Sequence, residues 1–162
     1  MAEMKPNSGG LVGQTADGYV FLKEIGTGAA SVVYQAMEPA ANNKLLAIKV
    51  LDRAEQALAG GENPRNPFIR ERKIAERFSE PGILRVFRTG ELFDGRFYMA
   101  MELVQGMTLA EELRHRGSIP WDEAVDISAS VAWSVTPLHE ARIIHRDITP
   151  GNVMVRMGKD GH

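Results

Sequence analysis

The stretch that decides the fold is His145-Arg146-Asp147-Ile148-Thr149-Pro150-Gly151-Asn152, which ends ten residues before the C-terminus. An aspartate follows a His-Arg pair, and an asparagine stands five positions after that aspartate. A positioned carboxylate accepts the proton of an attacking hydroxyl, and an amide oxygen is a suitable ligand for magnesium. Asp147 and Asn152 are therefore of residue types that can serve as a general base and as a magnesium ligand.

The composition is ordinary for a soluble globular protein of one domain or slightly more, with 162 residues, 44% hydrophobic and 25% charged. The formal net charge of -2 gives no basic field, so we expect no nucleic-acid partner. The absence of cysteine excludes a disulfide framework and a thiolate metal site. No apolar run reaches the length of a membrane span and no secretory signal is present, so we expect a cytoplasmic protein without a membrane segment.

The pattern of apolar residues predicts a sheet first and helices later. Residues 1–18 are polar and Gly-rich, and we expect a flexible tail there. Five β-prone runs follow, which predict an antiparallel sheet over residues 19–22, 31–34, 45–51, 83–89 and 96–101. A helix is expected between the third and fourth strands, from Phe68 to Phe78, because Asn66-Pro67 is a helix-start signal.

Two further helices are predicted in the second half of the chain. Thr108 and Glu111 form a capping-box pattern that opens a short helix, which Gly117 closes. A longer helix is expected over residues 121–142, opened by Pro120. Its apolar residues spread around most of the circumference, so we expect this helix to be buried on several sides.

A glycine-rich turn follows the first predicted strand. Gly26 and Gly28 are followed at position 31 by serine and by a strand, not by a helix, which argues against a dinucleotide-binding fingerprint. Glycines in such a hairpin let backbone donors approach phosphate oxygens. The alternative interpretation of this motif alone is a plain hairpin turn.

Lys49 is the one charged residue in the apolar run 45–51. A lysine in such a strand needs a partner or solvent, because burying an unpaired ammonium is costly. One interpretation makes it a point charge for nucleotide phosphates, held by Glu71 of the following helix, with Glu76 as the competing partner. The alternative is an edge-strand lysine that reaches water, with Glu71 a solvated surface residue.

The segment 101–106 lies between the last predicted strand and the capped helix. As a hinge it would present backbone groups of Glu102 and Val104 to the edge of a base, with Met101 behind them. The alternative is a simple connector.

Together, and in this order, these motifs resemble those of the protein kinase family, in the style of bacterial Ser/Thr kinases, over residues 19–161. The resemblance implies a phosphate-covering loop, an adenine site, a gatekeeper and a hinge, formed by Ile25, Gly26, Gly28, Ser31, Val33, Ala47, Met154, Met101, Glu102 and Val104. It also implies catalytic roles for Lys49, Glu71 and Asp147 and a magnesium-binding role for Asn152.

The implied fold is α+β and kinase-like, with a complete five-stranded antiparallel N-terminal lobe carrying one helix. Residues 19–106 would form that lobe and the hinge, and residues 107–162 the start of an incomplete helical C-terminal lobe. The implied function is ATP- and magnesium-dependent phosphorylation of Ser/Thr hydroxyls on a protein substrate.

Two departures from the family pattern define the alternative function. Thr149 stands where Ser/Thr kinases usually carry a lysine, and no Asp-Phe-Gly follows Asn152. They favour a nucleotide-binding pseudokinase or scaffold as the alternative. We expect the chain to be an N-terminal fragment with negligible transferase activity by itself, since the second metal-holding aspartate is missing. A small-molecule kinase of related fold is a third possibility, against which Arg146 argues weakly.

Overall fold

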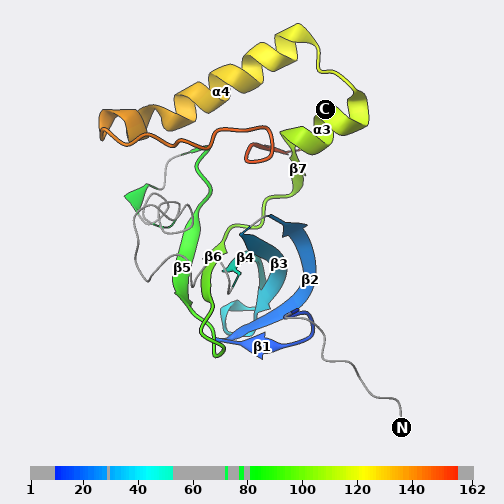
Figure 1. Cartoon of the computed structure of the whole chain (residues 1–162), viewed down its shortest axis with the longest axis vertical. Helices are drawn as coiled ribbons and strands as arrows, with labels where there is room; N and C mark the ends of the chain where they lie inside the picture. The colour runs from blue at the N-terminus through cyan, green and yellow to red at the C-terminus, as the bar shows by residue number, and fades with distance from the viewer. Residues whose placement is uncertain (1–9, 29, 53–71, 73–76, 79–80, 157–162) are drawn as a thin grey trace. The chain divides into compact units, whose positions relative to one another are not determined.

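The computed structural model describes residues 10–28, 30–52, 72, 77–78 and 81–156. The chain divides into two compact units, Met1–Lys73 with Val86–Leu103, and Ile74–Arg85 with Val104–His162. The first unit is built on a sheet, and the described part of the second includes the helices α3 and α4 (Figure 1). Of the helix expected over residues 68–78, only Arg72, Arg77 and Phe78 are described, and the first two are helical.

The sheet of the first unit contains the five predicted strands and one more. In chain order the strands are β1 (Thr15–Ala16), β2 (Tyr19–Thr27), β3 (Ser31–Glu38), β4 (Lys44–Leu51), β5 (Val86–Glu91) and β6 (Phe97–Met101). Their order in the sheet is β1-β2-β3-β4-β6-β5, and every pairing is antiparallel. The curled sheet is visible in Figure 1.

The two faces of the sheet differ because side chains alternate along each strand. In β4, Leu46, Ile48 and Val50 lie in the main core cluster, together with Phe21 and Tyr34, whose rings meet edge to face at 5.4 Å. Leu51 belongs instead to a second cluster, with residues 30, 97 and 99. The main core is therefore confined to one face of the sheet.

The expectation of a flexible tail over residues 1–18 is wrong for its described part. Leu11 is 1% exposed and Ala16 5% exposed, and both belong to the main core cluster. Asp17 and Gly18 both have positive φ, 48° and 85°, at the turn between β1 and β2. An Asp-Gly pair is the sequence signal for such a hairpin turn, and the polar, Gly-rich composition around it obscured that signal.

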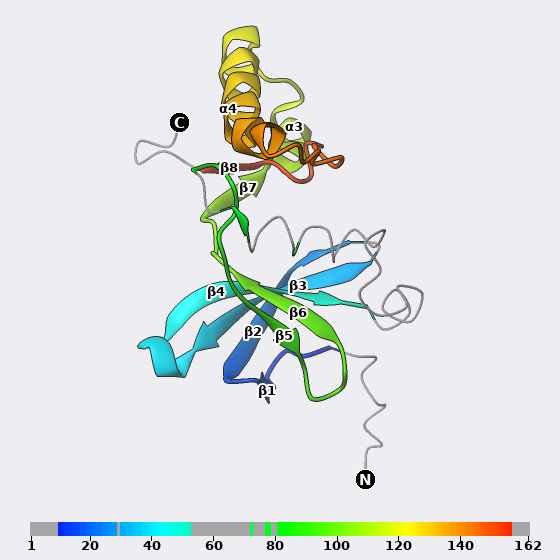
Figure 2. The same cartoon turned by 90° about the vertical axis from the view of Figure 1, so that its left-hand side faces the viewer.

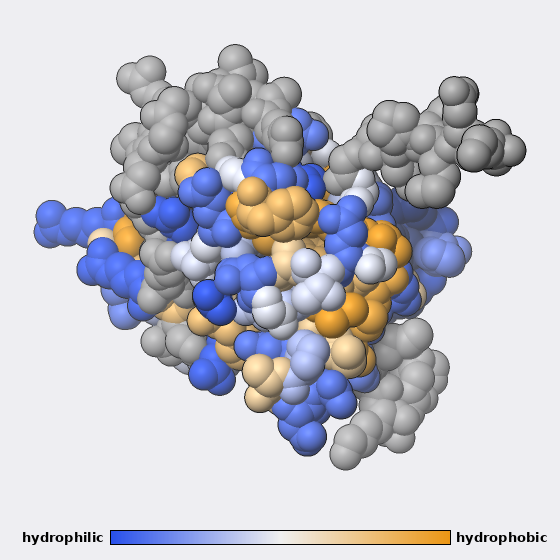
Figure 3. All heavy atoms as spheres, turned by 90° about the horizontal axis from the view of Figure 1, so that it is seen from below, coloured by the Kyte–Doolittle hydropathy of each residue, from blue (hydrophilic) through white to orange (hydrophobic). Residues whose placement is uncertain are grey.

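Several large hydrophobic side chains of the first unit remain exposed, among them Val12, Leu22, Leu45 and Phe93. Figure 3 shows that, on the face seen from below, hydrophobic residues lie in groups bordered by hydrophilic ones. Apolar atoms contribute much of the surface of any folded protein, so these groups do not by themselves indicate a binding site.

The second unit contains α3 (Leu109–Arg116), α4 (Trp121–Glu140) and a short pair of strands, β7 (Gly106–Thr108) and β8 (Met154–Arg156). The capping box at Thr108 and Glu111 is present, and the Gly117 N–H donates to the carbonyl of Leu113, as the sequence predicts. Figure 2 shows α3 and α4 on the same side of the strand pair. Among the residues that the structure describes, none of the helices has the length and apolar character that a membrane crossing requires.

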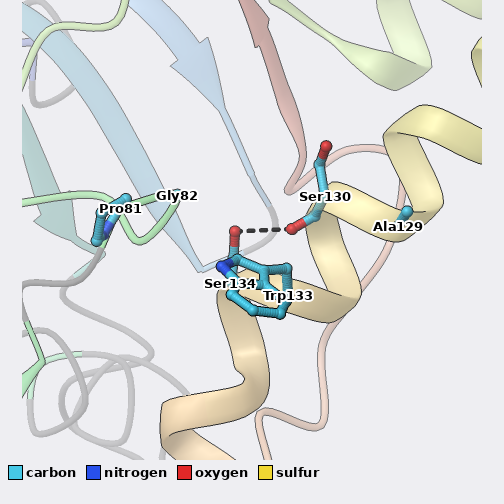
Figure 4. A pocket seen from close by; sticks show the side chains of 6 residues that line it. All are labelled: Pro81, Gly82, Ala129, Ser130, Trp133 and Ser134. Atoms are coloured by element: carbon cyan, nitrogen blue, oxygen red, sulfur yellow. Dashed lines mark hydrogen bonds between the residues drawn. The ribbon is translucent and has the colours of Figure 1, made fainter.

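The helix α4 is less buried than its pattern predicts. Leu138 is its only buried residue among those described, while Trp121 and Trp133 are each 81% exposed. Burial on several sides requires several packing partners, and one close approach to α4 is that of Gly82. A Cβ on Gly82 would lie 1.9 Å from Ser134 Oγ, at a pocket that Figure 4 shows beside the Ser134–Ser130 hydrogen bond.

Gly90 of β5 faces the ring of Tyr98, its register partner in β6. A Cβ at Gly90 would lie 2.8 Å from the ring of Tyr98, which is fully buried. We predict that Gly90→Ala lowers the free energy of unfolding by about 1–3 kcal/mol, because a packed core resists added volume. Gly10→Ala is the matched control, since nothing lies within 4 Å of its Cβ. Equal urea midpoints for the two variants would contradict this packing.

Candidate functional site

The strand register brings four predicted nucleotide-binding residues to one face of the sheet. Val33 is paired with Lys49, and Ala47 is paired with Met101. Directly opposed residues of antiparallel strands point to the same face, and residues two apart on β4 share that face too. Val33, Ala47, Lys49 and Met101 therefore lie together on the face opposite the main core.

The glycine-rich turn joins β2 to β3 beside this face. Gly26 pairs with Val33, and the Gly28 N–H donates to the carbonyl of Ser31 at 2.8 Å. A Cβ on Gly26 or Gly28 would make only ordinary contacts, at 3.8 and 3.7 Å, and neither residue has positive φ. The fold itself therefore does not require glycine at these two positions. Ile25, which precedes them, is 42% exposed.

The predicted partner of Lys49 cannot be placed. Lys49 is partly buried and pairs in register with Met99 as well as Val33. Glu71 and its competitor Glu76 both lie outside the described residues. The pairing of Lys49 with Glu71 stays a prediction.

The predicted hinge begins at the end of β6. Met101 is 6% exposed, consistent with a residue placed behind a binding surface. Glu102 is partly buried and belongs to the first unit, whereas Val104 and Met154 belong to the second. Their contacts with adenine therefore stay predictions.

The loop that carries Asp147 and Asn152, in the second unit, begins at a defined helix end. The Ile143 N–H donates to the carbonyl of Leu138 at 2.8 Å, and the Arg142 N–H donates to that of His139 at 2.9 Å. This pair of backbone hydrogen bonds forms a Schellman motif, with Arg142 in the left-handed conformation at φ 59°. It turns the chain out of α4 and toward Asp147.

Hydrogen bonds within the loop hold Asp147 and Asn152 together. Asn152 Nδ2 donates to Asp147 Oδ2 at 2.8 Å and to the Asp147 carbonyl at 3.0 Å. The Asp147 N–H donates to His145 Nδ1 at 3.3 Å, and Arg146 between them has φ 69°. Both side chains are exposed, so the carboxylate can meet an incoming hydroxyl. The Asn152 amide oxygen takes no part in these bonds and suits a magnesium ion.

The strands β7 and β8 frame the loop. Gly106 pairs with Arg156 and Thr108 with Met154, while the Ala110 N–H donates to the Pro150 carbonyl at 2.9 Å. The short apolar run at residues 153–155 predicts a strand, which is β8, but no pattern in the sequence predicts its partner β7. Lys159-Asp160-Gly161, whose sequence predicts a turn, lies outside the described residues. Within the described ranges, no three His, Cys, Asp or Glu side chains are grouped to hold a metal.

Residues 19–161 match the sequence model of the protein kinase domain. The chain belongs to the protein kinase family. It is 35% identical over 144 residues to the probable serine/threonine-protein kinase PknB of Lactococcus lactis, and 32% identical over 145 residues to PknI of Mycobacterium bovis. These alignments cover 86% and 88% of this chain, but 22% and 24% of the two relatives.

Solved kinase structures support the same fold. The kinase domain of Mycobacterium tuberculosis PknI superposes with a TM-score of 0.73 at 32% identity, covering 91% of this chain and 58% of that domain. Rad53 in complex with AMP-PNP gives a TM-score of 0.74 at 24% identity, over 91% of this chain and 38% of that one, which is a likeness of fold. The kinase-like α+β fold with an incomplete C-terminal lobe, expected from the sequence, is confirmed.

Gly106 is required for the β7–β8 frame of the kinase loop. A Cβ there would lie 2.1 Å from the carbonyl oxygen of Val155, a backbone atom that cannot rotate away. We predict that Gly106→Ala separates β7 from β8 and speeds amide hydrogen exchange at Met107 and Val155. Gly151→Ala is the control in the same loop, because its Cβ would make only an ordinary contact at 3.8 Å. Unchanged exchange in Gly106→Ala would show that the frame is not formed this way.

Proposed function

We propose that the chain's nucleotide-binding and loop residues serve ATP-dependent transfer of the γ-phosphoryl group to Ser/Thr hydroxyls of protein substrates. The proposal is carried by one observation: Val33, Ala47, Lys49 and Met101 share the sheet face opposite the core. This face offers apolar surface for a base and one cation for phosphates. The bacterial Ser/Thr kinases among its relatives support the choice of acceptor.

The glycine-rich turn has the properties of a phosphate-covering loop. Gly26 and Gly28 lack any internal reason to be glycine, since a Cβ would meet no close atom at either position. A ligand that approaches the backbone supplies such a reason, because side chains would hold phosphate oxygens away from the N–H groups. This favours the nucleotide interpretation over a plain hairpin turn.

Asp147 is proposed to orient the acceptor hydroxyl and take its proton. Its Oδ2 is held by Asn152 Nδ2, which fixes the carboxylate while its exposed position leaves it accessible. The Asn152 side chain fits magnesium. Only its Nδ2 bonds to Asp147, so its Oδ1, an uncharged oxygen ligand, is not used in those bonds. When bound, the ion would neutralise phosphate charge.

Thr149 favours the second candidate, a pseudokinase that binds nucleotide without transfer. It is exposed two residues after Asp147, where the family pattern has a lysine, and a hydroxyl supplies no charge to the transferring group.

Association with a protein substrate and a cytoplasmic location also stay predictions.

Alanine substitutions in the glycine loop separate ligand binding from folding. We predict that Gly26→Ala and Gly28→Ala each leave the free energy of unfolding within about 0.5 kcal/mol of the original. Each should weaken binding of a non-hydrolysable ATP analogue by about tenfold, the loss of one charge-assisted hydrogen bond. Calorimetric titration measures the affinity, with Gly10→Ala as the control.

Unchanged affinity in both variants would favour the alternative interpretation, in which the loop is a plain hairpin turn. Loss of stability together with affinity would show that the fold, and not the ligand, requires these glycines.

The 162-residue chain by itself is predicted to bind nucleotide but to transfer phosphate negligibly. Asn152 is its only proposed magnesium ligand, and two metal-holding groups serve phosphoryl transfer in kinases. Incorporation of radiolabelled phosphate into a generic protein substrate, with magnesium present, measures this. Robust incorporation that Asp147→Asn abolishes would overturn the prediction.

A further inference from the structure

A polar cluster joins the two ends of the first unit's sheet. The strands β1 and β5 are the outer strands of the sheet, yet Asp17, in the turn after β1, contacts both β5 and β6. Its Oδ1 lies 3.3 Å from Arg88 Nη2, and its Oδ2 accepts a hydrogen bond from the Tyr98 hydroxyl. Figures 1 and 2 both show β1 beside the lower end of β5 and β6. We call Asp17, Arg88 and Tyr98 the clasp.

The bond to Tyr98 is the stronger part of the clasp. Tyr98 is 0% exposed, and its ring meets that of Tyr19 edge to face at 5.9 Å. Burial raises the pKa of the Tyr98 phenol, and the hydrogen bond to Asp17 raises it further. The Arg88 side chain is 54% exposed, so its ion pair with Asp17 adds little by itself. A buried hydroxyl that loses its acceptor carries a full desolvation cost.

The strand β6 connects the clasp to the nucleotide face, which is the sheet face that carries Val33, Ala47, Lys49 and Met101. Tyr98 points into the main core, and its neighbour Met99 points to the opposite face, because side chains alternate along β6. Tyr98 pairs in register with Val50 and Met99 pairs with Lys49. Met99 is 1% exposed and packs in the second cluster with Leu51. A shift of β6 at Tyr98 therefore moves the strand against which Lys49 is placed.

We propose that Asp17 is a positioning residue for the nucleotide face, because its hold on Tyr98 fixes β6 beside Lys49. The inference depends on the proposed function only in taking the ligand to be a nucleotide. The placement of β6 by the N-terminal arm, residues 10–18, is inferred from the contacts that Asp17 makes in the first unit. The arm thereby contributes to binding without touching the nucleotide.

The test uses the 162-residue chain with Asp17→Ala and Tyr98→Phe. Asp94→Asn is the matched control, since Asp94 pairs with Arg96 at 2.8 Å inside the β5–β6 turn. All affinities are measured at a temperature where every variant is folded by circular dichroism. Asp17→Ala and Tyr98→Phe should each weaken binding of a non-hydrolysable ATP analogue by about three- to thirtyfold. The Asp94→Asn affinity should stay unchanged.

A further readout distinguishes positioning from a general loss of stability. The double variant Asp17→Ala/Tyr98→Phe should bind no more weakly than the weaker-binding single variant, because both changes break the same hydrogen bond.

Amide exchange of the β4–β6 ladder makes the failure of this inference distinct from failure of the proposed function. If the original chain binds no nucleotide, the proposed function fails, and faster exchange at Lys49 and Met99 in Asp17→Ala than in Asp94→Asn still supports the placement of β6. Folded Asp17→Ala with unchanged affinity, or with ladder exchange equal to that of Asp94→Asn, would overturn the inference.

Discussion

The alternation of side chains along β4 is the constraint on which the first unit depends. Leu46, Ile48 and Val50 enter the main core, and Ala47 and Lys49 point to the other face. A slip of one residue against β3 or β6 would carry the Lys49 ammonium into an apolar cluster, where an unpaired charge is very costly. The register is therefore strongly determined, and with it the set of residues that share a face with Lys49.

The second unit holds an exposed loop, which carries Asp147, in one conformation. Few of its described residues are buried, so packing contributes little, and local hydrogen bonds take its place. The Schellman motif sets the exit from α4, Asn152 holds the Asp147 carboxylate, and the β7–β8 pair closes the frame. The conformation around Asp147 therefore depends largely on hydrogen bonds within the loop itself.

Sequence reasoning succeeded where periodicity or caps were strong, as in the five longer strands and the capping box at Thr108. It failed for β1 and β7, because these short strands carry no apolar run and exist only through their partners. It predicted the helix α4 but not its exposure, since an apolar pattern indicates a need for burial but not the presence of a covering element. The clasp was invisible because Asp17 and Tyr98 are 81 residues apart. The role of Glu71, outside the described residues, stays a prediction.

If nucleotide phosphates lie at Lys49, affinity labelling should detect them there. An acyl-phosphate derivative of ATP transfers its acyl group to lysines near the phosphates, and peptide mass spectrometry identifies the modified residue. We expect labelling of Lys49 that excess ATP suppresses, with Lys23 and Lys44 of the same sheet labelled only slowly and without protection. Equal labelling of the three lysines, or labelling of Lys49 that ATP does not reduce, would contradict it.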